Sequence, residues 1–246
     1  MSETSKAADD LRQLIDHSKR IVFFGGAGMS TESGLPDFRS AHGLYNRAEG
    51  RSYEEMLSIG FFHSHPEEFW QFYRDVMLYP DAKPNAGHYA LARLEKQGKL
   101  KAVVTQNIDG LHQDAGSQTV YELHGTVLRN LCMKCGKVYD LDYILKQEGP
   151  PRCVCGGMLR PDIVFYGEQL DSTVVDSAIR AISHCDLLIV GGTSLTVYPA
   201  AGLLNYRHGA KLALINKQET AYDHQADLVI HESIAAVLDG AIAKGE

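Results

Sequence analysis

Ile21-Val-Phe-Phe-Gly-Gly-Ala-Gly-Met-Ser-Thr-Glu-Ser-Gly-Leu-Pro-Asp-Phe-Arg39 runs from an apolar strand into a glycine-rich turn and a helix start. In α/β proteins such a turn holds a pyrophosphate, because glycine lets the backbone approach the phosphates and helix N-terminal N–H groups bind them. Gly26-Ala-Gly28 is only half of the usual dinucleotide fingerprint, since Thr31 stands at the third glycine position. The aromatic and the cation of Pro36-Asp-Phe-Arg39 have no obvious use in an ordinary dehydrogenase. The stretch therefore predicts a dinucleotide site of a less common kind.

The rest of the chain alternates between apolar runs and helical patterns. Strands are expected over residues 21–24, 100–105, 120–123, 163–165, 186–190, 211–215 and 228–230, and helices over 7–17, 85–97, 173–183, 200–206 and 234–243. This alternation predicts an α/β fold with a mostly parallel, doubly wound sheet. Ligands of such sheets bind at the carboxyl ends of the strands. Polar or glycine-rich residues follow the strands that end at 24, 105, 123, 190 and 215, so we expect one shared site there.

Bulk composition limits the classes of function. The chain has 246 residues, which suits one large domain or one domain carrying a small module. Its net charge of −7 disfavours general binding to nucleic acids or anionic membranes and suits a cationic partner such as a Lys-rich peptide. We find no signal-peptide core and no run of about 20 apolar residues. We therefore expect a cytoplasmic protein with no membrane or nucleic-acid partner, and a monomer is the simpler arrangement.

Four of the five cysteines lie within a short segment. Cys132-Met-Lys-Cys135 and Cys153-Val-Cys155 form two close pairs, a spacing that suits tetrahedral zinc. No histidine or carboxylate in the cluster offers an open coordination position, so we expect one structural zinc ion. The alternative is a set of buried free cysteines. Cys185 stands alone and is expected in the core.

Several strand ends carry candidate ligand-binding side chains. His124 ends the strand over 120–123 and precedes a glycine, where its ring can act as a base near neutral pH. The run Gln106-Asn-Ile-Asp109 either caps the following helix or reaches ribose hydroxyls and a carboxamide. Thr193 and Ser194 either cap a helix that begins near Pro199 or contact a phosphate or ribose. Asn216 occupies a position where dinucleotide folds often bind a ribose.

Taken in order, these motifs resemble the sirtuin family, the NAD-dependent protein lysine deacylases. The resemblance extends from about residue 8 to 240 and is closest to the compact bacterial members. It rests on Gly26-Ala-Gly-Met-Ser30, Gly34-Leu-Pro-Asp-Phe-Arg39, Thr105-Gln-Asn-Ile-Asp109, Leu123-His-Gly125, the four paired cysteines, Arg160-Pro-Asp-Ile-Val164, Gly192-Thr-Ser194 and Asn216.

The resemblance implies a Rossmann-like domain over residues 1–40, 85–127 and 161–246, a helical module over 41–84 and a zinc module over 128–160. NAD, the co-substrate, and an acetyl-lysine peptide would share the cleft between them. By similarity the NAD-binding residues are Gly26, Ala27, Gly28, Ser30, Thr31, Phe38, Arg39, Gln106, Ile108, Asp109, Gly192, Thr193, Ser194 and Asn216. The peptide would pair as a third strand with Val164, Phe165, Gly167, Glu168, Leu195 and Val197.

The resemblance also implies a reaction. His124 would act as base toward the ribose hydroxyls, and Asn107 would position the ribose or a water molecule. The products would be free lysine, nicotinamide and O-acyl-ADP-ribose. ADP-ribosyl transfer to protein is an alternative with the same NAD cleavage. A non-catalytic NAD-sensing or zinc-ribbon module and a plain dehydrogenase are less consistent with the motifs.

The preferred acyl group is predicted from one position at which this sequence differs from relatives that act on acidic acyl groups. Members that prefer succinyl- or malonyl-lysine carry a Tyr and an Arg three residues apart in the helical module. Here Tyr73 matches that Tyr, but the Arg position holds Val76. Arg74 would point about 100° away from Tyr73 on a helix. We therefore expect acetyl and other neutral acyl groups to be preferred over acidic ones.

Overall fold

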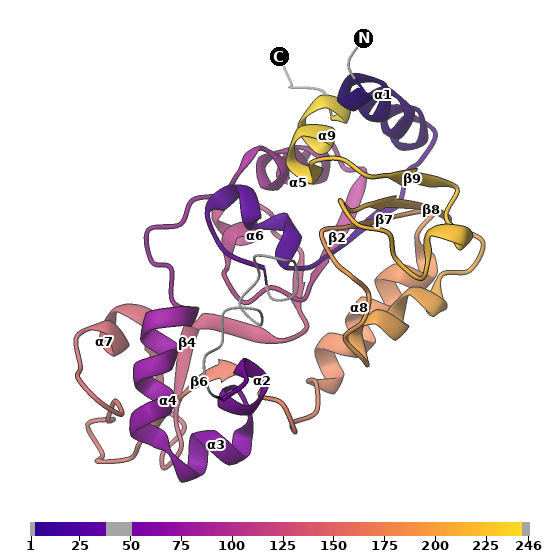
Figure 1. Cartoon of the computed structure of the whole chain (residues 1–246). Helices are drawn as coiled ribbons and strands as arrows, with labels where there is room; N and C mark the ends of the chain where they lie inside the picture. The colour runs from indigo at the N-terminus through magenta and orange to yellow at the C-terminus, as the bar shows by residue number, and fades with distance from the viewer. Residues whose placement is uncertain (1–2, 38–50, 243–246) are drawn as a thin grey trace.

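A parallel six-stranded sheet forms the centre of the larger lobe in the computed structural model, which describes residues 3–37 and 51–242 (Figure 1). The order of its strands is β3-β2-β1-β7-β8-β9. The bounds are β1 Ile21–Gly25, β2 Leu100–Thr105, β3 Val120–Glu122, β7 Leu187–Gly191, β8 Lys211–Ile215 and β9 Leu228–Ile230. The predicted α/β class and doubly wound sheet are confirmed.

Helices cover both faces of this sheet, because successive side chains of each buried strand point to opposite sides. On one face Phe23 and Ile189 pack with apolar residues of α1, α5 and α9. On the other face Val22, Phe24 and Val190 pack with residues of α8 and of the 3-10 helix η5. The bounds are α1 Glu3–Asp16, α5 Ala86–Lys96, α8 Ser172–His184, η5 Ala200–Tyr206 and α9 Ile234–Ala241. Helices α1 and α9 bring the two ends of the chain to the same side (Figure 1).

The strand order reverses between β1 and β7. From β1 the chain proceeds outward to β2 and β3, and it later returns to β7 and proceeds the other way to β8 and β9. Open α/β sheets bind ligands in the crevice at such a reversal, beside the carboxyl ends of the strands. Gly25 and Gly191 are the paired last residues of β1 and β7, so the glycine-rich turn begins at this crevice.

A smaller lobe combines an antiparallel sheet with short helices (Figure 1). The sheet has the order β5-β4-β6, and the shared core is largely aromatic, with Phe62, Phe69, Trp70 and Phe165 fully or almost fully buried. The bounds are β4 Gly125–Cys132, β5 Val138–Asp140, β6 Leu159–Ile163, α2 Tyr53–Met56, α3 Ile59–Ser64, α4 Pro66–Phe72 and α7 Leu141–Leu145, with a π-helical turn over Tyr73–Met77.

Some predicted elements differ from the structure. The strand expected over 163–165 is wrong: β6 ends at Ile163 and belongs to the small antiparallel sheet. The Val164 N–H makes one more hydrogen bond in the same register, to the His124 carbonyl, and the Phe165 N–H donates to the Glu168 carboxylate instead of to a strand. The helix expected over 200–206 is a 3-10 helix. Strands β4 and β5 and helices α6 (Leu111–Asp114) and α7 were not predicted. Short 3-10 helices over Ala27–Met29, Thr31–Ser33 and Asp223–Gln225 complete the fold.

The division into a Rossmann-like domain, a helical module and a zinc module stays a proposal. Strands β4 and β6 extend past residues 128 and 160 at either end of the segment assigned to the zinc module. Among the helices that the structure describes, none is both long and apolar enough to cross a membrane.

Candidate active site

A cleft of about 1010 Å³ lies at the carboxyl ends of the central strands and extends to the smaller lobe. Its walls contain most of the residues predicted for the site, brought together from six separate parts of the sequence. These are Gly26, Ala27, Gly28, Ser30, Thr31, Gln106, Asn107, Ile108, Asp109, His124, Val164, Phe165, Gly167, Glu168, Gly192, Thr193, Ser194, Val197 and Asn216. Leu195 does not line the cleft, and Phe38 and Arg39 lie outside the described residues.

The glycine-rich turn packs directly against the end of β7. The Gly28 N–H donates to the Gly192 carbonyl at 2.8 Å. A Cβ on Gly28 would lie 2.7 Å from the Gly192 Cα, and a Cβ on Gly192 would lie 2.3 Å from the Met29 nitrogen. Gly192 also has a φ of +62°, a conformation that favours glycine. Glycine at both positions therefore allows the two backbone segments to approach this closely.

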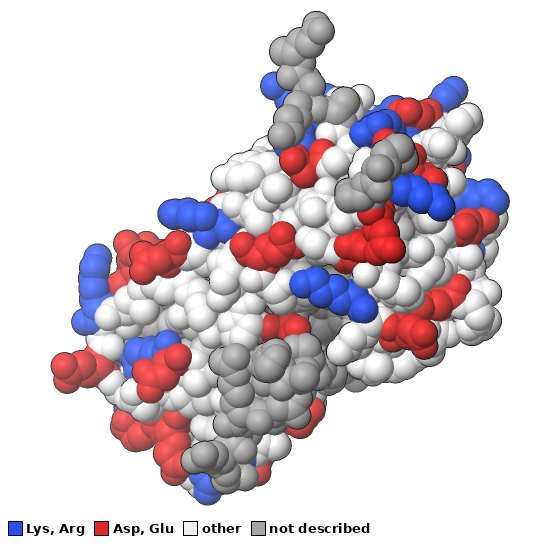
Figure 2. All heavy atoms as spheres, turned by 45° about the horizontal axis from the view of Figure 1, so that its top comes forward, with Lys and Arg blue, Asp and Glu red and all other residues white. Residues whose placement is uncertain are grey.

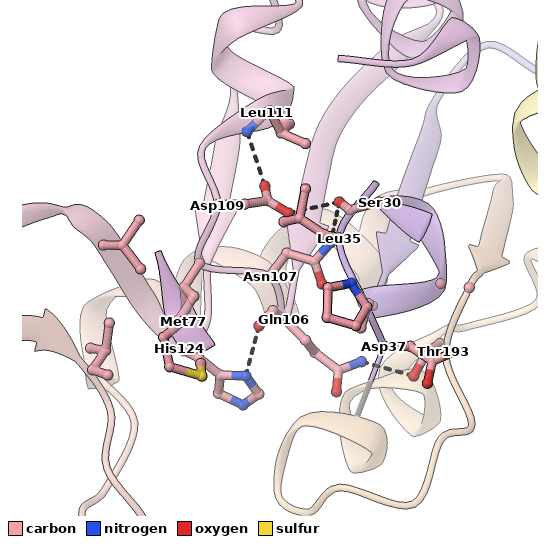
Figure 3. Close-up of a pocket in the computed structure, with 18 of the residues that line it drawn as sticks. Ser30, Leu35, Asp37, Met77, Gln106, Asn107, Asp109, Leu111, His124 and Thr193 are labelled. Atoms are coloured by element: carbon pink, nitrogen blue, oxygen red, sulfur yellow. Dashed lines mark hydrogen bonds between the residues drawn. The ribbon is translucent and has the colours of Figure 1, made fainter. Parts of the chain in front are cut away.

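His124 is half-buried at the junction between the two sheets (Figure 3). Gly125 must follow it, because φ is +76° there and a Cβ would lie 2.1 Å from the Asp162 carbonyl oxygen. The His124 Nδ1 lies 2.9 Å from the Gln106 carbonyl oxygen. Since a carbonyl only accepts, Nδ1 carries the proton and Nε2 is left with its lone pair. Burial lowers the pKa of His124 below its ordinary 6.5, despite the opposing effect of this hydrogen bond.

Ser30 connects Asn107 with Asp109 (Figure 3). Asn107 Nδ2 donates to Ser30 Oγ at 3.0 Å, and Ser30 Oγ donates to Asp109 Oδ2 at 2.7 Å. The second oxygen, Asp109 Oδ1, accepts from the Leu111 N–H at the start of α6. Burial raises the pKa of Asp109, and the hydrogen bonds from Ser30 and Leu111 oppose this rise. Asp109 therefore both accepts from the first N–H of α6 and lines the cleft.

On the β7 and β8 side, Thr193 receives two hydrogen bonds. Its Oγ1 accepts from Gln106 Nε2 at 3.0 Å and from the Leu195 N–H at 3.2 Å. Neither Thr193 nor Ser194 caps η5, whose N-terminal residue Pro199 makes no side-chain cap. Ser194 Oγ instead contacts Thr196 Oγ1 at 2.8 Å. Thr193 and Ser194 line the cleft, whereas Thr196 does not.

Two segments that the resemblance assigns to peptide binding both line the cleft. One is the turn that follows β6, with Val164, Phe165 and Gly167, and the other includes Val197. Leu195 differs from the expectation, because its side chain is buried in the core under β7. It adopts a φ of +56°, which is rare for a branched residue and turns the chain sharply after Thr193.

The four paired cysteines converge in the smaller lobe. Their sulfur atoms all lie within 4.8 Å of one another, and three of the separations are 3.5, 3.5 and 3.6 Å. Four thiolates at about 2.3 Å from a tetrahedral zinc are separated by about 3.8 Å, so the set fits this ion. Backbone N–H groups of Lys134 and Cys155 point to these sulfurs, as second partners of metal-bound thiolates do. The cluster lies away from the cleft, consistent with a structural role.

Sequence reasoning missed the apolar wall of the cleft. Leu35, Leu57, Met77, Val127 and Ile163 line it in addition to Val76. They come from five unrelated segments, and their apolar character alone could not distinguish them from core residues. Val76 and Met77 reach the cleft because the chain forms a π-helical turn after α4.

Comparison with known proteins identifies the family. The model of the Sir2 family matches residues 26–199. An NAD-dependent protein deacetylase of Clostridium acetobutylicum is 58% identical over 238 residues, which are 95% of this chain and 97% of that protein. A solved Sir2 structure with a deacetylated p53 peptide and 3′-O-acetyl ADP ribose has a TM-score of 0.87 at 40% identity and covers 94% of this chain and 95% of its own. A Sir2 complex with p53 peptide and NAD+ has a TM-score of 0.83 at 42% identity, covering 93% and 94%.

Proposed function

We infer that this chain, which belongs to the Sir2 family, is an NAD-dependent protein deacetylase. It removes acetyl groups from protein lysines and yields nicotinamide, O-acetyl-ADP-ribose and free lysine. The observation that carries this function is the histidine at the cleft, whose Nδ1 is held by the Gln106 carbonyl while Nε2 keeps its lone pair. NAD supplies the ribose that accepts the acetyl group.

In the proposed roles, His124 Nε2 takes a proton from a ribose hydroxyl. The lowered pKa keeps the ring neutral and able to accept that proton near pH 7. Asn107 would position the ribose or a water molecule, since Ser30 orients its amide. Asp109 and Gln106 would contact the nicotinamide and ribose ends, while Thr193, Ser194 and Asn216 would hold the adenosine end.

The peptide is proposed to bind as a strand between the turn at Gly167 and the segment at Val197. Among the hydrogen bonds of the described residues, the Gly167 N–H donates none. Such main-chain groups would pair with the substrate backbone and give affinity without strong side-chain selection. One zinc, held by the four cysteines, would supply no step of the reaction and would stabilise the smaller lobe.

We propose that neutral acyl groups are preferred. Val76 lines the cleft, whereas Arg74 is absent from its walls and donates to the Gly149 carbonyl at 2.6 Å. The Tyr73 hydroxyl is fully buried, and burial raises its pKa. No cation among these three residues would therefore meet the carboxylate of a succinyl group.

The remaining proposals concern partners and location. We propose a cytoplasmic monomer that binds neither nucleic acid nor membranes. On the described part of the face in Figure 2, acidic and basic side chains are interspersed, and the net charge is −7. Such a surface does not favour a polyanion. Light scattering after size exclusion tests the monomer, and a retardation assay with duplex DNA tests the second proposal.

The function is tested by incubating the purified protein with an acetyl-lysine peptide, with and without NAD. Loss of the acetyl mass only with NAD supports deacetylation. His124→Ala should fold and bind ADP-ribose but lose about a thousandfold in turnover. Near-normal turnover in a folded His124→Ala protein contradicts the role of the base. Attachment of ADP-ribose to the peptide would favour ADP-ribosyl transfer, which the relatives do not support.

A further inference from the structure

We propose that Arg160 and Glu168 form a positioning pair that shapes the peptide-binding turn, and that the Glu168 side chain acts there by holding the turn. The inference rests on the proposed function, because it concerns the same cleft. It assigns to Arg160 a role in substrate binding, and it gives the side chain of Glu168, a residue expected to pair with the peptide through its backbone, a role in holding the turn.

The pair connects β6, which contains Arg160, with Glu168 at the end of the turn that follows this strand. Arg160 Nη1 and Nη2 donate to Glu168 Oε1 and Oε2, each at 2.8 Å, in a two-pronged ion pair. Arg160 Nη2 also donates to the Ile163 carbonyl at 3.0 Å. Glu168 Oε2 in addition accepts from the Phe165 N–H at 3.0 Å. One planar guanidinium thus connects both ends and the middle of the turn, a geometry that lysine cannot reproduce.

Arg160 also packs over a buried aromatic ring within the turn. The guanidinium carbon of Arg160 lies 4.9 Å from the centre of the Phe165 ring. That ring is 2% exposed and stacks on Phe62 of α3 at 5.2 Å. With side chains only 24% and 25% exposed, Arg160 and Glu168 are partly shielded from water, which strengthens their attraction.

The rest of the turn is fixed from the other side. The Tyr166 N–H donates to the Leu57 carbonyl at 3.0 Å, and the Ile59 N–H donates to the Tyr166 carbonyl at 3.1 Å. Gly167, whose N–H is proposed to face the peptide, lies between Tyr166, held by these two hydrogen bonds, and Glu168, held by Arg160. Both carboxylate oxygens of Glu168 are engaged inside the turn, which assigns its side chain to holding the turn.

The turn is connected to the catalytic histidine through the backbone. The Val164 N–H donates to the His124 carbonyl at 3.0 Å. Val164 is the residue after Ile163, which Arg160 holds. A change in the turn should therefore alter peptide binding first and turnover second, whereas the glycine-rich turn that would bind NAD is built by other segments.

The test uses Arg160→Met, which keeps the volume of the stem but removes all donors. We expect the dissociation constant of an acetyl-lysine peptide to rise by about tenfold, because charged hydrogen bonds are lost. The dissociation constant of ADP-ribose should change by less than about twofold. Glu168→Gln, a milder change, should also raise the dissociation constant of the peptide, but by less. The double variant should be no worse than Arg160→Met alone, because the two residues act as a unit.

The matched control is Arg93→Met. Arg93 of α5 forms a 2.7 Å ion pair with Asp239 of α9. The side chains of both residues are 27% exposed, and neither residue lines the cleft. An equal loss of peptide affinity in Arg93→Met, or unchanged affinity in folded Arg160→Met and Glu168→Gln, overturns the inference. If the wild type binds the peptide but does not deacetylate it, the proposed function fails, while these affinities still decide the positioning role.

Discussion

His124 shows how one residue is prepared by its neighbours. The Gln106 carbonyl fixes the tautomer, Gly125 permits the turn that presents the ring, and burial disfavours the charged form. Each effect has a separate origin in the sequence. Its position at the end of a strand indicated that His124 belongs to the site. The contact of its Nδ1 with the Gln106 carbonyl, after β2, depends on the fold and could not be predicted.

The lowered pKa of His124 determines the expected pH dependence. Because the neutral ring is the proposed base, activity should be lost as pH falls through its pKa, which burial lowers below 6.5. We expect the acid limb of kcat/KM below pH 6.5, measured with saturating NAD and limiting peptide. The variant Asp109→Asn, although less active, should keep that limb. An acid limb above pH 6.5 in the wild type, or its loss in Asp109→Asn, would argue against His124 as the titrating base.

Acyl preference is expected to depend on the residue at position 76. Val76→Arg places a guanidinium on the cleft wall, where it can pair with an acyl carboxylate. The ratio of succinyl to acetyl turnover should rise by about tenfold or more. Gln71→Arg, on the exposed side of α4, adds the same charge away from the cleft and should leave the ratio unchanged. A wild-type preference for succinyl-lysine would refute the expectation.

At the scale of elements, the glycine-rich turn after β1 packs closely on the chain after β7 because Gly28 and Gly192 meet there. Gly192→Ala combines a φ of +62° with a contact 2.3 Å from the Met29 nitrogen. We expect a loss of about 2 kcal/mol or more in unfolding free energy and a clear loss of ADP-ribose affinity.

Gly209→Ala is the matched control for this prediction. Its φ is +73°, but no atom lies within 4 Å of the added Cβ. It should cost about 1 kcal/mol and leave ADP-ribose binding unchanged. Equal effects of the two substitutions in denaturant titrations and calorimetry would show that the close approach of Gly28 and Gly192 is unimportant.

The elements also show what the sequence could predict. Strands of the parallel sheet have continuous apolar runs, and β2, β8 and β9 coincide with their predictions. Strand β4 was missed, because an irregularity between Thr126 and Asn130 breaks the alternation of buried and exposed residues. The engagement of Glu168 by Arg160 was also unpredictable, since it depends on how the turn folds back on β6.

At the scale of the whole molecule, the cysteine cluster and the aromatic residues beneath the turn after β6 belong to one buried core. Cys132 and Cys153 belong to the same buried cluster as Phe62 and Phe165. The motifs predicted both the cysteine cluster and the cleft, but not that a single aromatic core connects them. This connection allows a structural ion outside the cleft to affect activity.

Zinc removal should therefore disable the enzyme indirectly. We expect one zinc per chain by elemental analysis, and Cys135→Ser should lose it together with thermal stability and peptide binding. Cys185→Ser, which alters a buried cysteine outside the cluster, should retain zinc and activity. Full deacetylation by folded, zinc-free protein would contradict the proposed structural role.

The central claim is that the acetyl group leaves lysine only by transfer to ADP-ribose in this cleft. The most direct measurement quantifies nicotinamide, deacetylated peptide and acetyl-ADP-ribose by mass spectrometry in a single reaction. We predict that the three appear in equal amounts and that none forms without NAD. Free acetate without nicotinamide, or ADP-ribose attached to the peptide, would contradict the claim.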